Sequence, residues 1–379
     1  MMSTVAVAKC HTYERAEVAL ERCLAELGGM GAFVRPGDRT LLKVNLVSGH
    51  DESRAVTTHP AIVSAVIRQV RNAGGIPFVG DSPALASAVA VARRAGIAKV
   101  CAEQHVSIVD LDEPVFVSAA RAKRAFRLSK QLRQFDVIVN IPKLKTHCLV
   151  GMTGAVKNMF GCIPGRLKTG HHLAQPGPIE FSEMLLALHD TVTPKLTVVD
   201  GVVGMEGPGP GAGDPRLFGV VVAGPSSIAV DTVCARILGF ADKEVSTVWL
   251  AQQRNISEAA LGNIEVRGEQ IGEVAIANLK KPRSSVTTRL PGPLMNLGKR
   301  LLTPGPAVLQ DRCLLCGDCM RICPARAVSM SGHGPRFDSR SCIRCYCCHE
   351  ICPASAIILK GWFEDERQDP SRTARQGAL

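Results

Sequence analysis

Short apolar runs alternate with longer amphipathic stretches over most of the chain, ending near residue 270. The apolar runs predict β-strands at Thr4–Ala8, Thr40–Leu46, Ile76–Gly80, Val106–Leu111, Asp136–Ile141, Lys195–Asp200 and Gly219–Ala223. The stretches with helical spacing predict α-helices at Tyr13–Leu27, Pro60–Ala73, Ala84–His105, Ile179–Val192 and Ser227–Leu238. Because strand and helix alternate, the pattern predicts an α/β fold with a mainly parallel sheet and flanking helices on both faces.

The periodic pattern stops near residue 278, and the character of the sequence changes there. We interpret residues 1–278 as the α/β domain and the proline-rich residues 279–306 as a linker between domains. Residues 307–363 hold most of the cysteines and predict a small C-terminal α+β domain of the ferredoxin-like type. The polar residues 364–379 predict a flexible tail.

Two cysteine runs of identical spacing, C-x-x-C-x-x-C-x-x-x-C-P, lie 29 residues apart in residues 307–363. Their members are Cys313, Cys316, Cys319 and Cys323, followed by Cys342, Cys345, Cys348 and Cys352. A short repeat of this kind indicates two copies of one supersecondary unit, related by an approximate two-fold axis. Three thiolates spaced by two residues can wrap one loop around three corners of a cubic cluster, which leaves the fourth corner for a remote ligand. We interpret the module as binding two 4Fe-4S clusters.

The runs resemble those of bacterial-type ferredoxins, in which the fourth cysteine of each run binds the other cluster. The resemblance implies two ligand sets, Cys313, Cys316, Cys319 and Cys352 for one cluster and Cys323, Cys342, Cys345 and Cys348 for the other. Zinc is the alternative, although structural zinc sites take four ligands, typically as two separated C-x-x-C pairs. Cys347 lies outside the ligand spacing, and its simplest interpretation is a bystander thiol beside the cluster.

Composition and charge argue against a membrane protein and against a nucleic-acid-binding protein. Of the 379 residues 46% are hydrophobic and 21% charged, as in globular proteins, and no leader pattern or long apolar stretch occurs. Because the cysteines follow a metal-ligand pattern rather than a disulfide pattern, we expect a cytoplasmic protein without a membrane span. The formal net charge is +11, but anionic clusters lower it. Aromatic residues are 4% and basic residues are dispersed, so nucleic acid is not an expected partner.

Polar residues gather where the predicted strands end, and open α/β sheets bind ligands at the carboxyl ends of their strands. A glycine-rich segment from Gly151 to Gly165 adds a cation and an amide where the backbone allows close approach. We predict cofactor-binding roles for Lys43, Asn45, Asp81, Asn158 and Glu206, and catalytic roles for Lys143, Lys145, His147 and Lys157. Each residue alone also fits a structural role, such as a helix cap at Asp81 or Ser82. Their convergence favours a site.

The α/β domain resembles the domain of unknown function family 362, which is often fused to bacterial-type ferredoxin modules. The segments that carry the resemblance are Leu42–Leu46, Gly80–Ser82, Asn140–His147, Thr153–Gly161, Asp200–Gly201, Met205–Gly209 and Ala229–Asp231. They span most of residues 40–240, and Cys342–Glu350 is similar to the fused module of the family. The resemblance implies family membership, but the name of the family assigns it no chemistry.

Three hypotheses about function follow. The first is a reductase that passes electrons from the clusters to a small anionic substrate or cofactor, with the lysines as anchors and His147 as a proton donor. The alternative is a non-catalytic ferredoxin-type carrier whose α/β domain docks a redox partner protein. The third is an additional metal site built from His147, Cys148, Cys162, His171 and His172.

Overall fold

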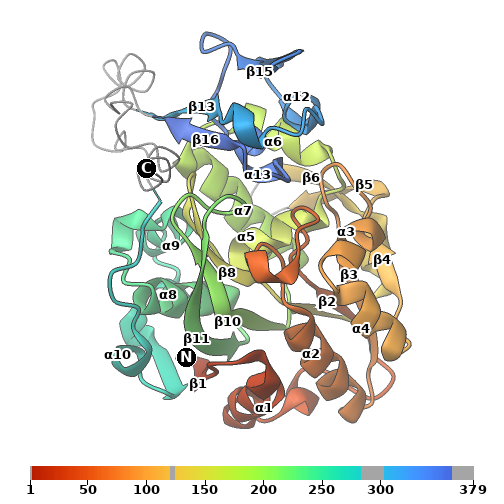
Figure 1. Ribbon diagram of the computed structural model, residues 1–379. Helices are drawn as coiled ribbons and strands as arrows, with labels where there is room; N and C mark the ends of the chain where they lie inside the picture. Colours follow the sequence, from red (N-terminus) through yellow and green to blue (C-terminus); the bar gives the residue numbers. More distant parts are fainter. Residues whose placement is uncertain (1, 120–123, 283–302, 361–379) are drawn as a thin grey trace, which may run out of the picture.

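The α/β fold and the small C-terminal module predicted from the sequence are both confirmed in the computed structural model (Figure 1). The structure describes residues 2–119, 124–282 and 303–360. The predicted tail and most of the predicted linker lie outside the described residues.

One sheet of ten strands, counted over the described residues, forms the centre of the α/β domain (Figure 1). The strand order is β12-β1-β11-β10-β7-β2-β3-β4, and β8 lies between β10 and β9. The strands are β1 Ser3–Lys9, β2 Arg39–Lys43, β3 Ile76–Asp81, β4 Ile108–Asp110, β7 Val137–Asn140, β8 Lys143–His147, β9 Gly151–Thr153, β10 Leu196–Glu206, β11 Asp214–Gly224 and β12 Ile264–Gly268. Pairing is parallel from β10 through β7, β2 and β3 to β4, so the carboxyl ends of these strands share one edge.

Helices cover both faces of the sheet, and each face has its own apolar core. Ala6 and Ala8 of β1 belong to the core beneath α1 to α4, whereas Val5 and Val7 belong to the core beneath α8. This division follows from the strand geometry, since successive side chains point to opposite faces. The longer helices are α1 Ala16–Glu26, α2 Pro60–Asn72, α3 Ala88–Arg94, α4 Ile97–Glu103, α7 Pro178–Val192, α8 Ser227–Ile237 and α9 Ser246–Gln253.

One predicted helix is wrong in its bounds. The stretch Ala84–His105 forms two helices, because Gly96 adopts a φ of 73° between α3 and α4. The side chain of Ser87 caps α3 by accepting a hydrogen bond from the N–H of Ala90 at 3.1 Å, so neither Asp81 nor Ser82 is its cap. The hairpin of β5 (Pro114–Ala119) and β6 (Arg124–Ser129) was also not predicted.

Two strands between β7 and α5, β8 and β9, were not predicted because their sequence is polar. In β8 all five residues are buried, including two lysines and a histidine, so the strand lacks the alternation that sequence patterns detect. Its neighbour β9 is only three residues long. Together they place the polar segment Asn140–His147 inside the domain rather than on its surface.

The cysteine module lies at one end of the α/β domain, close to α6 (Leu167–Ala174) (Figure 1). It consists of two small antiparallel sheets and two short helices, with bounds β13 Gly305–Val308, β14 Val328–Ser331, β15 Gly334–Phe337, β16 Ile357–Lys360, α12 Asp318–Ile322 and α13 Cys347–Ile351. Ala84 and Leu85 of the α/β domain pack against the apolar core of the module. Tyr346 in turn joins the core around α7, so the two parts share an interface.

The short helix α5 (Ala155–Asn158) is fixed at its N-terminus by Asp231 of α8. The Asp231 carboxylate accepts hydrogen bonds from the N–H groups of Ala155 at 2.6 Å and Val156 at 3.0 Å. These are N–H groups that a helix cannot pair internally. Burial raises the pKa of Asp231 to about 6, against the effect of those two hydrogen bonds. The contact holds the segment that carries Lys157 and Asn158.

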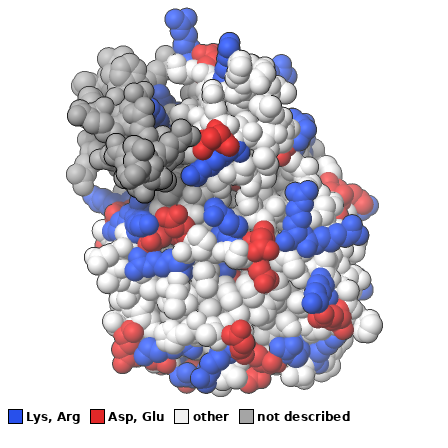
Figure 2. Space-filling view, viewed as in Figure 1, with Lys and Arg blue, Asp and Glu red and all other residues white. Residues whose placement is uncertain are grey.

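Charge is mixed over the face of the molecule that Figure 2 shows, where Lys and Arg side chains lie interspersed with Asp and Glu. None of the helices in the described part of the chain has the length and apolar character needed to cross a bilayer.

We predict that Gly154→Ala lowers the unfolding temperature, because a Cβ at this residue would lie 2.0 Å from Asp231 Oδ1. Forcing a methyl group into a filled space costs about 2 kcal/mol. Anaerobic scanning calorimetry at one scan rate measures the change. Gly31→Ala is the matched control, since a Cβ there meets no atom within 4 Å. Equal unfolding temperatures for the two variants would show that the Asp231 contact does not position α5.

Candidate functional site

A cavity of about 100 Å³ lies between the α/β domain and the cysteine module. The α/β domain contributes polar wall residues from the ends of β2 and β3, from β9 and α5, and from α6. The module contributes Ile322, Cys347, Glu350 and Ile351. The site therefore exists only where the two parts of the chain meet.

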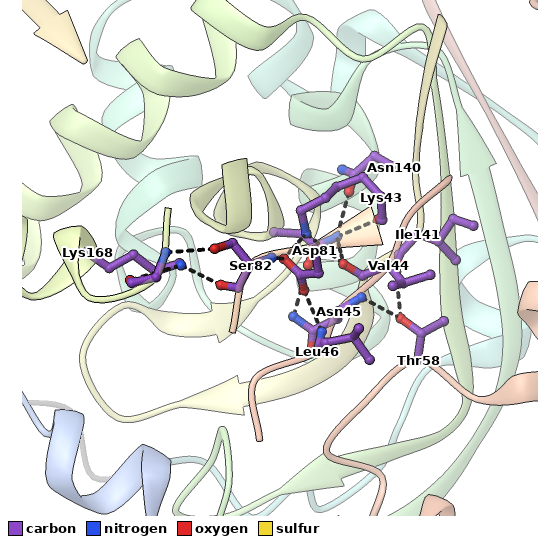
Figure 3. A network of polar contacts seen from close by, with 12 residues as sticks. Lys43, Val44, Asn45, Leu46, Thr58, Asp81, Ser82, Asn140, Ile141 and Lys168 are labelled. Carbon is purple, nitrogen blue, oxygen red and sulfur yellow. Dashed lines mark hydrogen bonds and ion pairs between the residues drawn. The ribbon is translucent and has the colours of Figure 1, made fainter. Parts of the chain in front are cut away.

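The ends of β2 and β3 are joined by a buried ion pair between Lys43 and Asp81 (Figure 3). Lys43 Nζ lies 2.8 Å from Asp81 Oδ1, and both side chains are almost fully buried. Asp81 also accepts the N–H groups of Leu46 at 2.6 Å and Ser82 at 2.7 Å. A buried carboxylate with a cation and two N–H donors has its charge compensated, so this pair stabilises the cavity wall.

A chain of side-chain hydrogen bonds continues from this pair across three strand ends. Lys145 Nζ donates to Asn45 Oδ1 at 2.9 Å, and Asn45 Nδ2 donates to Asn158 Oδ1 at 2.9 Å. Asn158 Nδ2 then donates to Asn140 Oδ1 at 2.8 Å and to the carbonyl of Lys43 at 3.1 Å. The amides of Asn45 and Asn158 line the cavity but already have protein partners, so the geometry gives them a positioning role.

Two lysines of the cavity wall supply positive charge. Lys157 makes no hydrogen bond or ion pair with any residue that the structure describes, and it lines the cavity. Lys168 of α6 also lines the cavity and donates to the carbonyls of Ser82 and Gly165. Burial, partly offset by Asp81, lowers the pKa of Lys168 to about 7. Lys168 was not recognised as a site residue from the sequence, because α6 was not among the predicted helices.

Two polar atoms of the wall, Thr153 Oγ1 and His172 Nδ1, have neither a hydrogen bond nor an ion-pair partner among the described residues, whereas Glu350 Oε1, which also lacks a hydrogen bond, lies beside His147 Nε2. Thr153 is 2% exposed and His172 is 4% exposed. Burial lowers the pKa of His172 to about 3, so its ring is neutral at physiological pH. A buried polar group without a hydrogen bond costs about 1–3 kcal/mol, so the two atoms point to a ligand or water in the cavity.

His147 does not line the cavity but contacts Glu350, which does. Its Nδ1 accepts the N–H of Leu149 at 3.0 Å, so the proton of the neutral ring is on Nε2, which lies 3.0 Å from Glu350 Oε1. Burial and the nearby charge of Lys157 lower the pKa of His147 to about 4. Burial opposes ionisation of Glu350, but Lys157 and His147 outweigh it and hold its pKa below the usual range. The contact joins β8 to α13, and the proton-donor role of His147 stays a prediction.

The structure does not bring Lys143 or Glu206 to the cavity. Lys143 Nζ lies 2.8 Å from Asp200 Oδ2 and donates to Tyr13 Oη at 2.7 Å, and burial lowers the pKa of Lys143. Glu206 pairs with Arg216 at 2.6 Å. Lys145 is also absent from the wall and reaches it only through Asn45; burial and repulsion from Lys157 lower the pKa of Lys145 to about 7. These three contacts support the fold around the site.

The eight cysteines of the two runs surround two small cavities in the module. One is lined by Cys313, Cys316, Cys319 and Cys352, and the other by Cys323, Cys342, Cys345 and Cys348. Each cavity thus combines three cysteines of one run with the fourth cysteine of the other run. This is the exchange that the ferredoxin resemblance implied, and four thiols around one space fit a cubic cluster.

The additional metal site predicted from two cysteines and three histidines is wrong for the part of the chain that the structure describes. The side chains of His147, Cys148, Cys162, His171 and His172 do not gather there into a group that could hold a metal ion. Instead the His172 ring stacks on Phe181 at a centroid distance of 4.4 Å. Cys162 is fully buried, and burial raises the pKa of its thiol to about 12.

Comparison with protein families settles the membership of the chain. A family model described as Domain of unknown function (DUF362) matches residues 40–236. The chain belongs to the DUF362 family. A second model, described as a 4Fe-4S dicluster domain, matches residues 306–353 of this DUF362 chain. The resemblance to a family fused to ferredoxin modules is confirmed, and the DUF362 chain is an iron-sulfur protein with a ferredoxin-type electron-transfer module.

Individual proteins also resemble this DUF362 chain. Thylakoid-associated protein sll1697 of Synechocystis sp. is 39% identical over 257 residues, which are 67% of the chain and 80% of that protein. The lactate racemase apoprotein from Thermoanaerobacterium thermosaccharolyticum aligns with 63% of the chain at 12% identity and a TM-score of 0.43. The aligned region spans 58% of the length of the racemase.

We predict that Asn158→Ala lowers the free energy of unfolding by about 3 kcal/mol, because it leaves two buried polar groups unpaired. These groups are Asn45 Nδ2 and Asn140 Oδ1, whereas the carbonyl of Lys43 keeps its hydrogen bond from the N–H of Ile141 at 2.8 Å. Anaerobic thermal unfolding measures the loss. Asn263→Ala is the control, since Asn263 is exposed and makes one side-chain hydrogen bond. An Asn158→Ala protein as stable as the control variant would contradict the positioning role.

Proposed function

We propose that this protein is a reductase in which two 4Fe-4S clusters pass electrons to a small anionic ligand in the cavity between the α/β domain and the module. The clusters would be held by the two sets of four cysteines that surround the two module cavities. Each bound cluster supplies one electron at a time, so two clusters can deliver the pair that most reductions of organic molecules require.

The position of Cys347 is the observation that carries this proposal. Cys347 lines the cavity of the second cysteine set and also lines the cavity between the domains. It follows Cys345 and precedes Cys348, both members of that set. Cys347, predicted as a bystander thiol, would therefore be the one residue between a cluster held there and a ligand in the cavity.

The wall residues of the α/β domain indicate the chemical class of the ligand. Lys157 and Lys168 present positive charge, and Thr153 Oγ1 and His172 Nδ1 offer buried hydrogen-bonding atoms without protein partners among the described residues. A small carboxylate or phosphate with further polar groups satisfies both features. The walls from both domains would hold the ligand partly away from bulk water, where charge interactions are stronger.

A reducing compartment such as the cytoplasm suits this chemistry. None of the 15 cysteines is in a disulfide in the structure. Thiolate ligands remain available to clusters where disulfides do not form.

The proposal predicts that a small carboxylate or phosphate reoxidises the protein after anaerobic reduction with dithionite and removal of the excess. Absorbance of the clusters records reoxidation during a screen of such anions. For an anion that turns over, Lys157→Gln should raise KM about tenfold or more, because a charge-assisted hydrogen bond is lost.

Lys99→Gln provides the matched control for that experiment, because the Lys99 side chain is 82% exposed on α4. Its turnover should equal that of the unchanged protein. Full turnover by Lys157→Gln would remove the proposed site, and reoxidation by none of the anions would favour the carrier alternative.

The lowered pKa of Lys168 predicts a pH dependence of anion affinity. Lys168 is charged below its pKa of about 7 and loses its charge above it, so affinity is full at low pH and falls as pH rises. The titratable neighbours of Lys168 are Asp81, Lys43, Cys162 and Lys157. Calorimetric titration with sulfate, which does not titrate in this range, should show a loss of up to about tenfold per pH unit above pH 7.

Two variants of Lys168 distinguish the effect of its positive charge from the effect of its deprotonation on sulfate affinity. Lys168→Arg keeps a cation that does not titrate, so its sulfate affinity should be independent of pH between 6 and 9. Lys168→Gln should bind sulfate weakly throughout that range. A pH dependence unchanged in Lys168→Arg would assign the titration to another group.

A further inference from the structure

Two isoleucines of the cavity wall come from equivalent positions of the cysteine repeat. A shift of 29 residues aligns the two runs, so Ile322 of α12 corresponds to Ile351 of α13. Both side chains line the cavity between the domains and belong to the apolar core of the module. Each directly precedes the fourth cysteine of its run, Cys323 of the second set and Cys352 of the first. The two halves of the module thus present the same apolar side chain to the cavity, one residue from a cysteine of each set.

The α/β domain contributes further apolar wall residues. They follow the ends of β2, β3 and α5 in the chain and are Leu46, Val47, Pro83, Ala84 and Phe160. A ligand without an apolar part would leave this surface in contact with water, and burial of apolar surface is favourable. The wall therefore favours a ligand that has an apolar body as well as a charge.

The charged side chains around the cavity nearly balance one another. The wall carboxylate of Asp81 is paired with Lys43. The wall also contains one further carboxylate, that of Glu350, and one lysine that balances it, Lys157. These two pairs of opposite charges leave no net charge for a ligand to compensate.

The excess positive charge comes from two other lysines. Lys168 lines the cavity, and Lys145 reaches the wall through Asn45. Burial lowers the pKa of each lysine to about 7, so at pH 7 each is half charged and the two together carry about one positive charge. Because an uncompensated charge away from water is costly, the cavity suits a ligand with a single negative charge.

The size of the cavity and its unpaired polar atoms restrict the ligand further. The cavity is about 100 Å³. Since an apolar cavity of about 150 Å³ holds benzene, with six carbons, this space holds an apolar body of about four carbons or fewer. The Thr153 hydroxyl and the neutral His172 ring, whose Oγ1 and Nδ1 are unpaired among the described residues, can each donate a hydrogen bond to a carboxylate oxygen.

We propose that the cavity binds a small aliphatic monocarboxylate whose apolar body of about two to four carbons packs on Ile322 and Ile351. The carboxylate is held by Lys157 and Lys168. The proposal rests on the anion cavity of the proposed function and narrows its ligand, because phosphate esters and dicarboxylates carry more than one charge at neutral pH. It does not rest on electron transfer to the ligand.

The test is anaerobic calorimetric titration at pH 7 of the full protein, with its clusters, using acetate, propionate and butyrate as probes. Affinity should rise about fourfold with each added CH₂ group, because each group removed from water adds a similar favourable free energy. Succinate is the matched control ligand, since it has the chain length of butyrate and a second carboxylate in place of the methyl group. Succinate should bind at least about tenfold more weakly than butyrate, because its second charge is uncompensated.

Variants of the two isoleucines test the contact with the apolar body. Ile351→Val removes one CH₂ group from the wall and should weaken butyrate binding about twofold to fourfold, while acetate affinity stays the same. Ile322→Val should do the same, and it provides the test if Ile351→Val loses iron. Ile357→Val is the matched control, because Ile357 belongs to the same apolar core but does not line the cavity. The ratio of butyrate to acetate affinity should be unchanged in that control.

Three results would overturn the monocarboxylate and leave the anion cavity standing. They are equal affinities for acetate, propionate and butyrate, tighter binding of succinate or sulfate than of butyrate, and a ratio of butyrate to acetate affinity that neither isoleucine variant changes. Absence of binding by every one of these anions would overturn both the monocarboxylate and the cavity of the proposed function. Butyrate binding in the predicted pattern, without reoxidation of the reduced clusters by any carboxylate, would support the monocarboxylate and contradict the reductase.

Discussion

The exchange of the fourth cysteine between the two runs is the constraint on which the rest of this structure depends. Because Cys323 belongs with the second set and Cys352 with the first, neither half of the module can form its site alone. The exchange fixes α12 and α13 next to one another. Both helices then reach the cavity, α12 through Ile322 and α13 through Glu350 and Ile351.

The α/β domain forms one part of the cavity wall, and α13 of the module forms another. Buried polar pairs such as Lys43 with Asp81 hold the ends of the parallel strands rigid, and Asp231 fixes the helix that presents Lys157. Most polar groups near the cavity are satisfied by protein, so those left free among the described residues define the place for a ligand. The repeat in the module and the edge of the sheet thus contribute opposite walls of one site.

Local sequence patterns predicted the sheet and most of the helices, because each depends on spacing within a short segment. Resemblances carried by short motifs supplied the family and implied the two ligand sets. The same patterns brought Lys43, Asn45, Asp81 and Asn158 to one edge but did not separate wall residues from the buried support at Lys143. Lys168, His172 and Glu350 were not recognised as wall residues. Their positions depend on tertiary packing of α6 and on docking of the module, and no local period records either event.

The most direct test of the central claim is diffraction at the iron absorption edge from crystals grown without oxygen. The account predicts two separate iron peaks, one inside each set of four cysteines, with the second peak next to Cys347 and the cavity between the domains. Density for a small molecule beside Thr153 and His172 would accompany them. A single iron peak, or iron bound anywhere other than within the two cysteine sets, would contradict the account.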